Sequence, residues 1–238
     1  MTVAVVTGAS RGLGAGMVGR FLERGVTVAG CARTEPALPG ALTAAVDVTD
    51  AAAVDAFAAR VTAEFGPIHL WVNNAGVLDP MGPLRDLDPA DVEAHLRVNI
   101  MGVVHGTQAY ARHVRAREGG GVLVNISSGA ALGGRAGWAA YCAGKAAVDR
   151  ITDCVQLEEE DAGLRAYAVA PGVIDTDMQA QIRSTEPERF PDVGQFHELK
   201  ERGAFNTPAY VADRLLDLAF EPSHRLDAVV LRLPPEHP

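Results

Sequence analysis

The chain has 238 residues, of which 48% are hydrophobic and only 5% aromatic, and it carries a formal net charge of −9. This length suits one α/β domain with a core of Ala, Val and Leu, as a parallel sheet packed between helices requires. The acidic balance argues against nucleic acid or an anionic membrane surface as a partner, but it leaves room for a local basic site.

Targeting, membrane-spanning, disulfide and metal-binding features are not expected in this sequence. The first predicted strand begins at Val3, which leaves no room for a signal peptide, and no apolar run approaches the ~20 residues that a bilayer-spanning helix needs. The 3 cysteines form no CxxC pair, and the 7 histidines show no HExxH or similar ligand spacing. We therefore expect a protein of a reduced, cytoplasmic compartment without a metal ion.

The chain opens with a β-branched apolar run, residues 3–7, that predicts a buried strand. Gly8, Gly12 and Gly14 follow and open a predicted helix. Glycine is needed where the backbone must approach a pyrophosphate without a Cβ in the way, and the free N–H groups at a helix start favour an anion. The GxxxGxG spacing differs from the GxGxxG of longer dinucleotide-binding folds. Taken alone, these glycines also fit a tight strand–helix turn with no ligand.

The end of the second predicted strand, residues 26–32, indicates the cofactor preference. NAD-preferring folds place an acidic residue there, which accepts hydrogen bonds from the ribose hydroxyls and would repel a 2′-phosphate. In this chain the strand ends at Ala32 and Arg33, and Arg11 lies inside the glycine loop, so two guanidiniums and no carboxylate face a phosphate. We predict NADP(H). The alternative is that both arginines are solvated surface residues.

Further strands and helices follow in alternation. A Pro- and Gly-rich stretch after the second strand predicts a loop, and a third strand, residues 42–47, precedes a helix that Asp50 could cap. A fourth strand spans residues 68–74. A long helical pattern then runs from about residue 90 to 117, and Asn99 interrupts it, because asparagine is neither a good helix former nor a natural core residue.

Ser128, Tyr141 and Lys145 form the chemically richest neighbourhood. Ser128 follows a fifth predicted strand, and Tyr141 and Lys145 share a face of an Ala-rich predicted helix, one turn apart. A phenol has a pKa of about 10 in water, and a lysine ammonium one turn away should lower that pKa toward neutrality. Such a phenol can give a proton to a carbonyl oxygen or take one from an alcohol. Trp138 is either a pocket wall or a packing residue, and Cys142 fits packing better than a nucleophile.

After a sixth predicted strand, the segment 177–205 has the pattern of a lid-like insertion. Its helical pattern is interrupted by prolines and a glycine, and a cover over a cleft is the use that such an insertion favours. Met178 and Gln179 lie in this segment and are candidate substrate contacts, with a plain surface helix as the alternative. The chain ends with a helix that Thr207 starts and a strand predicted over residues 227–233.

Six motifs stand in order along the chain: TGASRGLG at residues 7–14, Asp47-Val48, NNAG at 73–76, Asn99, the set Ser128, Tyr141 and Lys145, and PGVIDT at 171–176. Together they resemble the short-chain dehydrogenase/reductase family over nearly the whole chain. Within that family, GWAAYCAGKAA and PGVIDTDMQAQIR followed by FHELKERGAF look similar to the sepiapterin reductase and benzil reductase branch. The resemblance implies a Rossmann-type, doubly wound α/β fold in a single domain, residues 1–238, with a mostly parallel seven-stranded sheet and helices on both faces.

The same resemblance implies a role for each motif. The catalytic residues would be Asn99, Ser128, Tyr141 and Lys145, and Asn99 would kink its helix and hold a water that links the lysine to solvent. Asp47 and Val48 would lie against the adenine ring, and the backbone of Val173 and the hydroxyl of Thr176 would meet the nicotinamide carboxamide. The residues that would contact the dinucleotide are Gly8, Ser10, Arg11, Gly12, Leu13, Gly14, Arg33, Asp47, Val48, Asn74, Ala75, Gly76, Asn99, Tyr141, Lys145, Pro171, Gly172, Val173 and Thr176. The substrate would meet Ser128, Trp138, Tyr141, Met178 and Gln179, and a homodimer or homotetramer is expected.

The leading interpretation is an NADPH-dependent carbonyl reductase in which Tyr141 protonates the oxygen of a small ketone or vicinal diketone. Sepiapterin reductases place a carboxylate on the last strand, whereas this chain has Leu231 at about that position, which favours a substrate less polar than a pterin. One alternative is a secondary-alcohol dehydrogenase working oxidatively in a biosynthetic pathway. Another is a non-catalytic NADP-sensing regulator, which would have no need of Tyr141 and Lys145.

Overall fold

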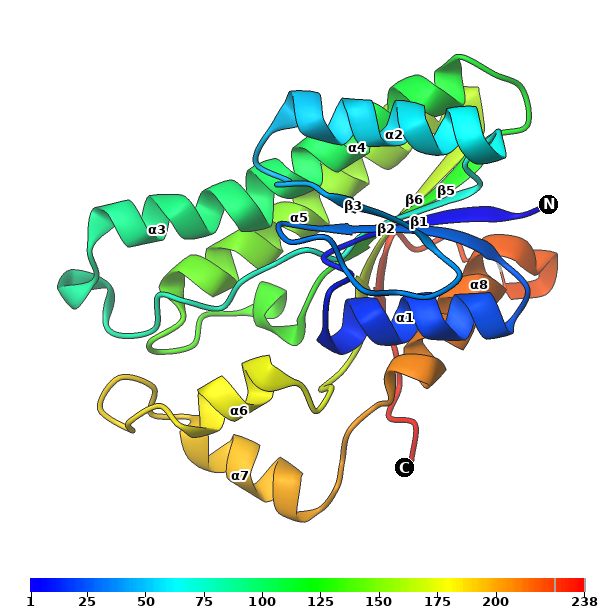
Figure 1. Cartoon of the computed structure of the whole chain (residues 1–238). Helices are drawn as coiled ribbons and strands as arrows, with labels where there is room; N and C mark the ends of the chain where they lie inside the picture. Colours follow the sequence, from blue (N-terminus) through cyan, green and yellow to red (C-terminus); the bar gives the residue numbers. More distant parts are fainter. Residues whose placement is uncertain (225, 238) are drawn as a thin grey trace.

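The computed structural model describes residues 1–224 and 226–237, and within them one parallel sheet of seven strands carries the fold (Figure 1). The strands are β1 (Val3–Thr7), β2 (Thr27–Ala32), β3 (Leu42–Ala45), β4 (Leu70–Asn73), β5 (Gly121–Ile126), β6 (Leu164–Ala170) and β7 (Val230–Arg232). Their spatial order is β3-β2-β1-β4-β5-β6-β7, so the chain winds from β1 to one edge and then returns across β1 to the other. The predicted doubly wound α/β fold is therefore confirmed.

Helices cover both faces of the sheet. On one face lie α1 (Gly12–Glu23) and α8 (Pro208–Phe220), and on the other lie α2 (Ala51–Phe65), α4 (Gly102–Arg115) and α5 (Ala139–Glu159), with α3 (Pro89–Leu96) leading into α4 (Figure 1). Two further helices, α6 (Asp177–Arg183) and α7 (Val193–Glu201), stand apart from the sheet. Single 3₁₀ turns occur at Leu84–Asp86, Gly129–Leu132, Glu160–Ala162 and Pro222–His224. Among the described residues, no helix combines the length and apolarity that crossing a bilayer would require.

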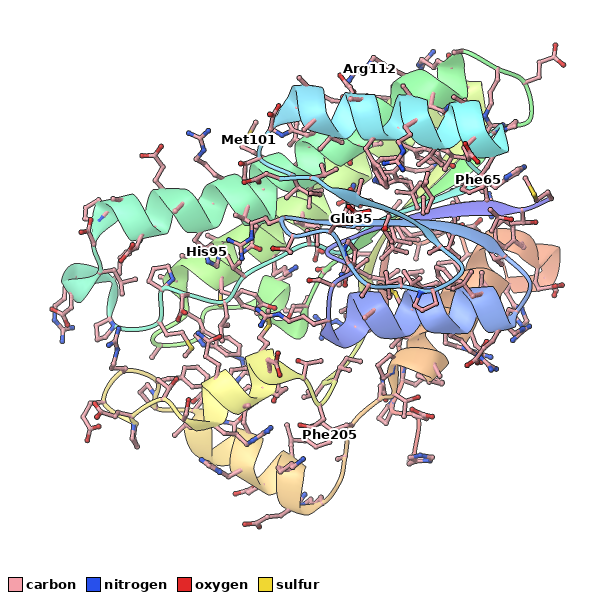
Figure 2. All side chains as sticks on the ribbon, viewed as in Figure 1. Glu35, Phe65, His95, Met101, Arg112 and Phe205 are labelled. Atoms are coloured by element: carbon pink, nitrogen blue, oxygen red, sulfur yellow. The ribbon has the colours of Figure 1, made fainter. Side chains whose placement is uncertain are left out.

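The two faces of the sheet make two apolar cores, and residues alternate between them along each strand. In β1, Ala4 and Val6 pack with α1 and α8, whereas Val3 and Val5 pack with α2 and α4. Side chains fill both layers (Figure 2). Because both faces of the sheet are covered, every residue of β1 is buried, so its sequence is an unbroken apolar run rather than an alternating one.

Both predicted helix starts are confirmed by their caps. The Asp50 carboxylate accepts hydrogen bonds from the N–H groups of Ala52 at 2.9 Å and Ala53 at 3.1 Å at the start of α2. The Thr207 hydroxyl oxygen accepts a hydrogen bond from the N–H of Tyr210 at 3.1 Å at the start of α8. In each case a side-chain oxygen satisfies N–H groups that have no partner inside the helix.

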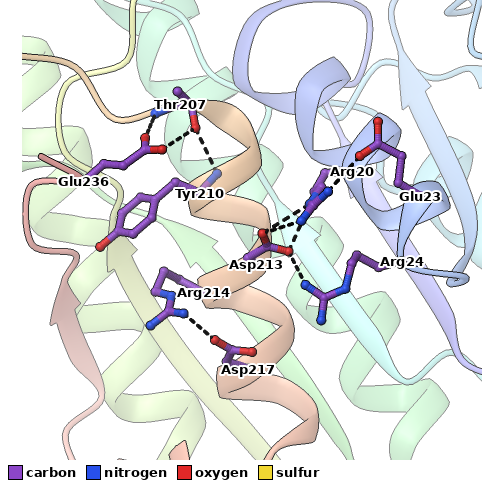
Figure 3. Close-up of polar contacts among 9 residues, drawn as sticks. All are labelled: Arg20, Glu23, Arg24, Thr207, Tyr210, Asp213, Arg214, Asp217 and Glu236. Carbon is purple, nitrogen blue, oxygen red and sulfur yellow. Dashed lines mark hydrogen bonds and ion pairs between the residues drawn. The ribbon is translucent and has the colours of Figure 1, made fainter.

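Polar contacts join α1 to α8 and tie the C-terminal segment to the start of α8 (Figure 3). The Asp213 carboxylate accepts hydrogen bonds from Nη2 of Arg20 at 2.9 Å and from Nη1 of Arg24 at 2.6 Å. The N–H of Thr207 donates to Oε2 of Glu236 at 2.6 Å, and the Thr207 hydroxyl donates to Oε1 at 3.1 Å. These contacts fix the angle at which α8 leaves the sheet edge.

The strands predicted over residues 26–32, 42–47, 68–74 and 227–233 are all shorter in the structure, where they span Thr27–Ala32, Leu42–Ala45, Leu70–Asn73 and Val230–Arg232. The apolar pattern over residues 227–233 predicted the last strand, but only Val230–Arg232 pair with β6, and they do so at the edge of the sheet. The third strand ends at Ala45 rather than at residue 47. Its end is set by Asp47, whose carboxylate accepts a hydrogen bond from the N–H of Thr49 at 2.9 Å and turns the chain.

The helical pattern over residues 90–117 is interrupted at Asn99, as predicted. Between α3 and α4 the structure has a π-helical turn, Arg97–Met101. In this wider turn, Oδ1 of Asn99 accepts a hydrogen bond from the N–H of Val77 at 2.9 Å, and Nδ2 donates to the Val77 carbonyl at 2.8 Å. The interruption therefore bonds the helix to the loop that follows β4, and single π turns of this kind are frequent at functional sites.

Candidate active site

The predicted site residues come together at the carboxyl edge of the sheet. The winding direction reverses between β1 and β4, and open α/β sheets bind ligands at such a reversal. The segments that follow the strands carry Gly8, Ser10, Arg11, Gly12, Leu13 and Gly14 after β1, Arg33 after β2, Asp47 and Val48 after β3, Asn74, Ala75 and Gly76 after β4, Ser128 after β5, and Pro171, Gly172, Val173 and Thr176 after β6. The π-helical turn adds Asn99, and α5 adds Tyr141 and Lys145.

The glycine loop after β1 is built for close approach of backbones. Gly8 has a φ of +68°, and a Cβ on it would lie 2.6 Å from Cα of Ala75. A Cβ on Gly14 would lie 2.3 Å from the carbonyl oxygen of Gly8. The first turn of α1 contains no acidic residue, so its N–H groups present an uncompensated positive helix end. This cradle fits the pyrophosphate of a dinucleotide.

Hydrogen bonds hold the glycine loop to the loop after β4. The hydroxyl oxygen of Thr7 accepts hydrogen bonds from the N–H groups of Asn74 at 3.0 Å and Ala75 at 3.1 Å. Nδ2 of Asn74 donates to the Thr7 carbonyl at 2.9 Å and to the Gly8 carbonyl at 3.2 Å. Asn74 therefore fixes the two loops against each other, and Thr7, which the sequence analysis did not single out, is its main partner.

The two arginines that predict a phosphate site have different surroundings. Arg33 is exposed at the end of β2, and it contributes to lowering the pKa of Asp47, for which the N–H of Thr49 is the larger cause. Nη1 of Arg11 lies 3.3 Å from Oδ2 of Asp177 at the start of α6, and the two side chains are 75% and 77% exposed. An exposed pair of this kind contributes little stability and breaks readily. Asp177, an unpredicted partner, thus competes for one of the two guanidiniums.

Ser127 and Ser128 have different partners. Ser127 is buried and donates a hydrogen bond to the carboxylate of Asp149 on α5. Ser128 is half-buried, accepts a hydrogen bond from the N–H of Ala130 at 3.2 Å at the start of the 3₁₀ turn Gly129–Leu132, and lies close enough to Tyr141 to lower the pKa of the phenol. Ser128 is therefore the serine that lies beside the phenol.

Lys145 and Tyr141 lie one turn apart on α5, as their spacing predicts. Nζ of Lys145 lies 5.8 Å from the centre of the Tyr141 ring and donates to the carbonyl oxygen of Ile126 at 2.7 Å, and the lysine is only 7% exposed. The Tyr141 ring meets Trp138 and His95 edge-on, with ring centres 5.3 Å and 6.2 Å away. These contacts fix the phenol in one orientation.

The electrostatics of the pair differ from the prediction. Burial lowers the pKa of Lys145 to about 8, and the carboxylate of Asp149 opposes that decrease. The pKa of Tyr141 is raised, first by burial, although the hydrogen bond with Ser128 opposes the rise. The prediction that Lys145 brings the Tyr141 pKa toward neutrality is therefore wrong for this structure, because burial disfavours both charged forms and Nζ lies over the ring. A phenol with a raised pKa is protonated at neutral pH and suits a proton donor.

Asn99 is held by His95 as well as by Val77. Nδ2 of Asn99 lies 2.7 Å from Nε2 of His95, and Nδ1 of His95 lies 2.6 Å from the carbonyl oxygen of Asp79. The sequence analysis missed His95. The one indication of it in the sequence was that His95 stands one helical turn before Asn99, so that the two residues share a face of the predicted helix.

Trp138 is buried in an apolar cluster, and its contact with a substrate stays a prediction. Its ring is 5% exposed and stacks on Phe190, with ring centres 4.5 Å apart and an interplanar angle of 9°. Its Nε1–H donates to the sulfur of Met81 at 3.2 Å. The apolar cluster beneath α6 and α7 to which it belongs also contains Leu78, Ala130, Ile182, Val193 and Phe196. This cluster forms a rigid backing for Tyr141.

The candidate substrate contacts on α6 are not plain surface residues. Met178 is half-buried against the apolar cluster beneath α6 and α7. Gln179 is 9% exposed, and its Oε1 has no hydrogen-bond partner among the described residues. Their contact with a substrate stays a prediction.

Polar contacts tie the segment 177–205 to the neighbouring loops. Nε2 of Gln181 donates to Oδ2 of Asp79 at 2.5 Å. Nη2 of Arg189 donates to the Met81 carbonyl at 2.8 Å. The segment therefore rests on the loop that follows β4.

The loop after β6 is anchored by Asn206. Gly172 has a φ of +81°, and a Cβ there would lie 2.6 Å from Nδ2 of Asn206. That Nδ2 donates to the Pro171 carbonyl at 2.8 Å, and the N–H of Asn206 donates to the Val173 carbonyl at 2.9 Å. Thr176 closes this loop against the glycine loop, since a Cβ on Gly12 would lie 3.2 Å from its Cγ2. Asn206 carried no sequence signal, because its partners are brought to it only by the fold.

Comparison with known proteins gives a consistent picture. Residues 2–187 match the sequence profile of the family described as short chain dehydrogenase. The chain is 31% identical over 234 residues to a benzil reductase ((S)-benzoin forming) of Bacillus cereus, covering 92% of this chain and 94% of the relative. It is 34% identical over 243 residues to a 2-(R)-hydroxypropyl-CoM dehydrogenase of Xanthobacter autotrophicus, covering 96% and 95%. The crystal structure of the KRED1-Pglu enzyme matches with a TM-score of 0.84 at 32% identity, covering 93% and 95%.

The profile, the relatives and the solved structure agree with the motif order and with the fold. Both reductases and dehydrogenases occur among the relatives, so the chemistry that they share with this site is the interconversion of a carbonyl and an alcohol. The cofactors of this chemistry are NAD(H) or NADP(H). The chain belongs to the short-chain dehydrogenase/reductase family and is an oxidoreductase that acts on carbonyl or alcohol groups.

Proposed function

We propose that this protein is an NADPH-dependent carbonyl reductase that transfers hydride to a ketone or vicinal diketone of a small organic molecule. The observation that carries the proposal is that Tyr141, with Ser128 beside it, lies at the same edge of the sheet as the glycine cradle. A positioned proton donor and a dinucleotide cradle at one edge are the two parts that carbonyl reduction needs.

In this mechanism Tyr141 gives its hydroxyl proton to the carbonyl oxygen of the substrate. Ser128 hydrogen-bonds to the same oxygen and orients it. The phenol starts protonated at neutral pH, as proton donation to a carbonyl oxygen requires. Lys145, with a pKa of about 8, and Asn99 in the neighbouring π-helical turn then return a proton toward the phenol from solvent.

The residues of the cradle fit NADP(H), and the cofactor, when bound, supplies the hydride. Gly8 and Gly14 admit no Cβ, and the start of α1 is free of acidic side chains. The pyrophosphate would lie against Gly8, Ser10, Gly12, Leu13 and Gly14, and the adenine would lie against Asp47 and Val48. The nicotinamide side would lie against Asn74, Ala75, Gly76, Pro171, Gly172, Val173 and Thr176. The ribose hydroxyls would lie against Tyr141 and Lys145.

The preference for NADP(H) over NAD(H) rests on Arg33 and Arg11. Arg33 is exposed and directly follows β2, where no carboxylate is present to accept the ribose hydroxyls. Arg11 pairs with Asp177 on the surface, and a 2′-phosphate would compete for that guanidinium. A doubly charged phosphate is the stronger partner for a planar guanidinium.

The proposed substrate class follows from the surroundings of Tyr141. The nearby apolar cluster beneath α6 and α7 includes Trp138, Phe190 and the half-buried Met178, which favour an aryl or alkyl ketone. The last strand, Val230–Arg232, contains no acidic residue that could anchor a pterin. Leu231 itself packs against the core of α1 and α8. A relative that is named for benzil reduction supports a vicinal diketone.

An NADPH-consumption screen of the purified protein tests the proposal. The substrates are benzil and other vicinal diketones, sepiapterin, quinones and ketosteroids, with NADH in parallel. We expect the fastest turnover with a diketone and NADPH. Oxidation of secondary alcohols by NADP⁺ without carbonyl reduction would favour the dehydrogenase alternative, which the dehydrogenases among the relatives support. Dinucleotide binding without any turnover would favour the sensing alternative.

The proposal extends to assembly and location. Many enzymes of this family form homodimers or homotetramers, and one of these states is expected here. Cys31, Cys142 and Cys154 are all free thiols, which supports a reducing, cytoplasmic compartment. The segment 177–205, tied to the loop after β4 by Gln181 and Arg189, would act as the cover of the substrate site.

A further inference from the structure

His95 lies on α3 (Figure 2). It is buried between the loop after β4 and helix α5, and it faces Asn99 and Tyr141. The imidazole is 1% exposed. Its Nδ1 lies 2.6 Å from the carbonyl oxygen of Asp79, which can only accept a hydrogen bond, so Nδ1 carries the proton. Its Nε2 is then an acceptor in the neutral ring, and Nδ2 of Asn99 donates to it at 2.7 Å.

The orientation of the Asn99 amide supports this assignment independently. Oδ1 of Asn99 accepts from the N–H of Val77, which places Nδ2 toward the Val77 carbonyl at 2.8 Å and toward Nε2 of His95. Both amide protons of Asn99 therefore have acceptors, and one of those acceptors is the lone pair of His95. A protonated Nε2 would turn that contact into two donors facing each other.

We propose that His95 is a positioning residue of the reductase: its neutral ring locks the Asn99 amide, and proton uptake at Nε2 breaks the lock and lowers turnover. The activity part of this inference rests on the proposed function. The carbonyl of Ala140, on α5, also acts on the ring by raising its pKa.

The groups that face His95 set the pH at which the lock breaks. From α5, Lys145 and Tyr141 face the ring, and from the loop after β4, Asp79 does. Burial is the main cause that lowers the pKa of His95, the charge of Lys145 lowers it further, and the carbonyls of Asp79 and Ala140 oppose these effects. The pKa of His95 therefore lies below the ordinary histidine value of about 6.5, so the neutral form dominates at that pH and above it, and turnover falls only in more acid solution.

The lock matters because Asn99 contacts two parts of the site. A Cβ on Gly76, beside the predicted cofactor path, would lie 2.9 Å from Oδ1 of Asn99. On the other side, a Cβ on Gly144, next to Lys145 on α5, would lie 3.5 Å from Cβ of Asn99. A rotated Asn99 would thus disturb both the loop after β4 and the residues that return the proton to Tyr141.

The first arm of the test is the pH profile of kcat and KM between pH 5 and 9 for the wild type, His95→Gln and His113→Gln. Glutamine keeps a donor for Asp79 and an acceptor for Asn99 but does not titrate. We expect His95→Gln to be close to the wild type at pH 8 and to lose the acid limb of kcat. His113→Gln is the matched control, because His113 is a half-buried histidine away from the site that accepts a hydrogen bond from the N–H of Ile68, just before β4. Its acid limb should be unchanged.

Asp149 is a second group near the site whose pKa is raised, and it remains in His95→Gln. An acid limb that persists in this variant would therefore assign the limb to Asp149 or another group and overturn the inference. His95→Leu removes both hydrogen bonds and should lower kcat at every pH by about tenfold, the effect of leaving one buried polar group unpaired.

The second arm needs no activity. Histidine side-chain NMR of the ¹⁵N-labelled wild type, with His95→Gln to assign the signals, should show His95 as the Nδ1–H tautomer at pH 8. The side-chain amide protons of Asn99 should shift with the same midpoint as His95. An Nε2–H tautomer, or Asn99 amide signals that do not shift as His95 titrates, would refute the proposed hydrogen bond between His95 and Asn99 even if the carbonyl screen succeeds. A failed screen with the expected NMR result would instead refute only the proposed function.

Discussion

The Lys145 side chain lies over the ring of Tyr141 and is held there by the end of β5. Nζ is 5.8 Å from the ring centre and donates to the Ile126 carbonyl at 2.7 Å. The lysine is thereby placed on the strand side of the phenol, with a pKa near 8, while the pKa of the phenol is raised. Of the two groups, the lysine is therefore the first to change charge as pH rises above neutrality.

Carbonyl reduction should lose activity on the alkaline side as Lys145 deprotonates, with a midpoint near the pKa of about 8. The carboxylate of Asp149 favours the ammonium and so raises this pKa. Asp149→Asn removes that charge, keeps an acceptor for the Ser127 hydroxyl, and should move the alkaline limb of kcat to lower pH. The measurement is the rate of NADPH oxidation between pH 6 and 10.

Asp161→Asn is the control for this shift, because Asp161 is an exposed residue that pairs with Arg115 beyond the end of α5. Its alkaline limb should coincide with that of the wild type. A limb that moves to higher pH in Asp149→Asn would contradict the assignment of Lys145 as the titrating group.

Tyr141→Phe should lower kcat by about 10²- to 10⁴-fold, the usual contribution of a general acid. The ring keeps its edge contacts with Trp138 and His95, so folding and dinucleotide binding should be unchanged. Stopped-flow or steady-state turnover and fluorescence titration with NADPH measure the two quantities separately. Tyr210→Phe, on α8, loses only a hydrogen bond to the Pro234 carbonyl and should stay active. Near-normal turnover of Tyr141→Phe would remove the proposed proton donor.

The sequence was sufficient to predict the parts of the fold and site that depend on local pattern. The buried strands follow from unbroken β-branched runs, and the glycine cradle follows from Gly8, Gly12 and Gly14 at their spacing. The positions of Tyr141 and Lys145 one turn apart follow from helical geometry. Each of these features needs only information within about one turn or one strand of the chain.

Features that depend on tertiary contacts could not be predicted in the same way. Arg11 and Asp177 are separated by 166 positions, and His95 meets the carbonyl of Asp79 only because α3 folds back over the loop after β4. The error in the Tyr141 pKa has the same origin. The spacing to Lys145 was visible in the sequence, whereas the burial that dominates both pKa values was not.

Arg33→Ala should raise the KM for NADPH far more than the KM for NADH, because it removes one charge-assisted contact to the 2′-phosphate. Losing such a contact is worth about 1.5–3 kcal/mol, or roughly ten- to a hundredfold in KM. Arg112→Ala is the control, since Arg112 pairs with Asp55 on the surface of α4 and α2. Equal effects on the two cofactors would refute the phosphate assignment.

Asp177→Asn should affect NADPH in the opposite direction. The variant releases Arg11 from its surface pair and leaves the guanidinium free for the 2′-phosphate. Because an exposed ion pair is weak, the gain in NADPH affinity should be no more than about fivefold. The Kd for NADH, which has no 2′-phosphate, should not change. A weaker affinity for NADPH in this variant would mean that Asp177 positions Arg11 rather than competes for it.

Buried histidines should make the fold less stable in mild acid. Nδ1 of His69 accepts the N–H of Val3 at 3.1 Å, and Nε2 of His113 accepts the N–H of Ile68 at 2.9 Å, so both rings act as neutral acceptors near strand starts. The pKa of each is lowered, first by burial and then by Arg117.

Because these folded-state pKa values lie below the unfolded value of about 6.5, the unfolded chain binds more protons as pH falls through that range. The contribution of these histidines to the free energy of unfolding should therefore be at its maximum above about pH 6.5. Below that pH it should decrease, by up to about 1.4 kcal/mol per pH unit for each histidine. Carboxylates with lowered pKa, such as Asp213, act only at lower pH, near and below about 4. Urea unfolding between pH 5 and 8 measures the slope, and His113→Gln should flatten it, because glutamine does not titrate. A slope that is the same in the variant and the wild type would show that His113 takes up no proton on unfolding.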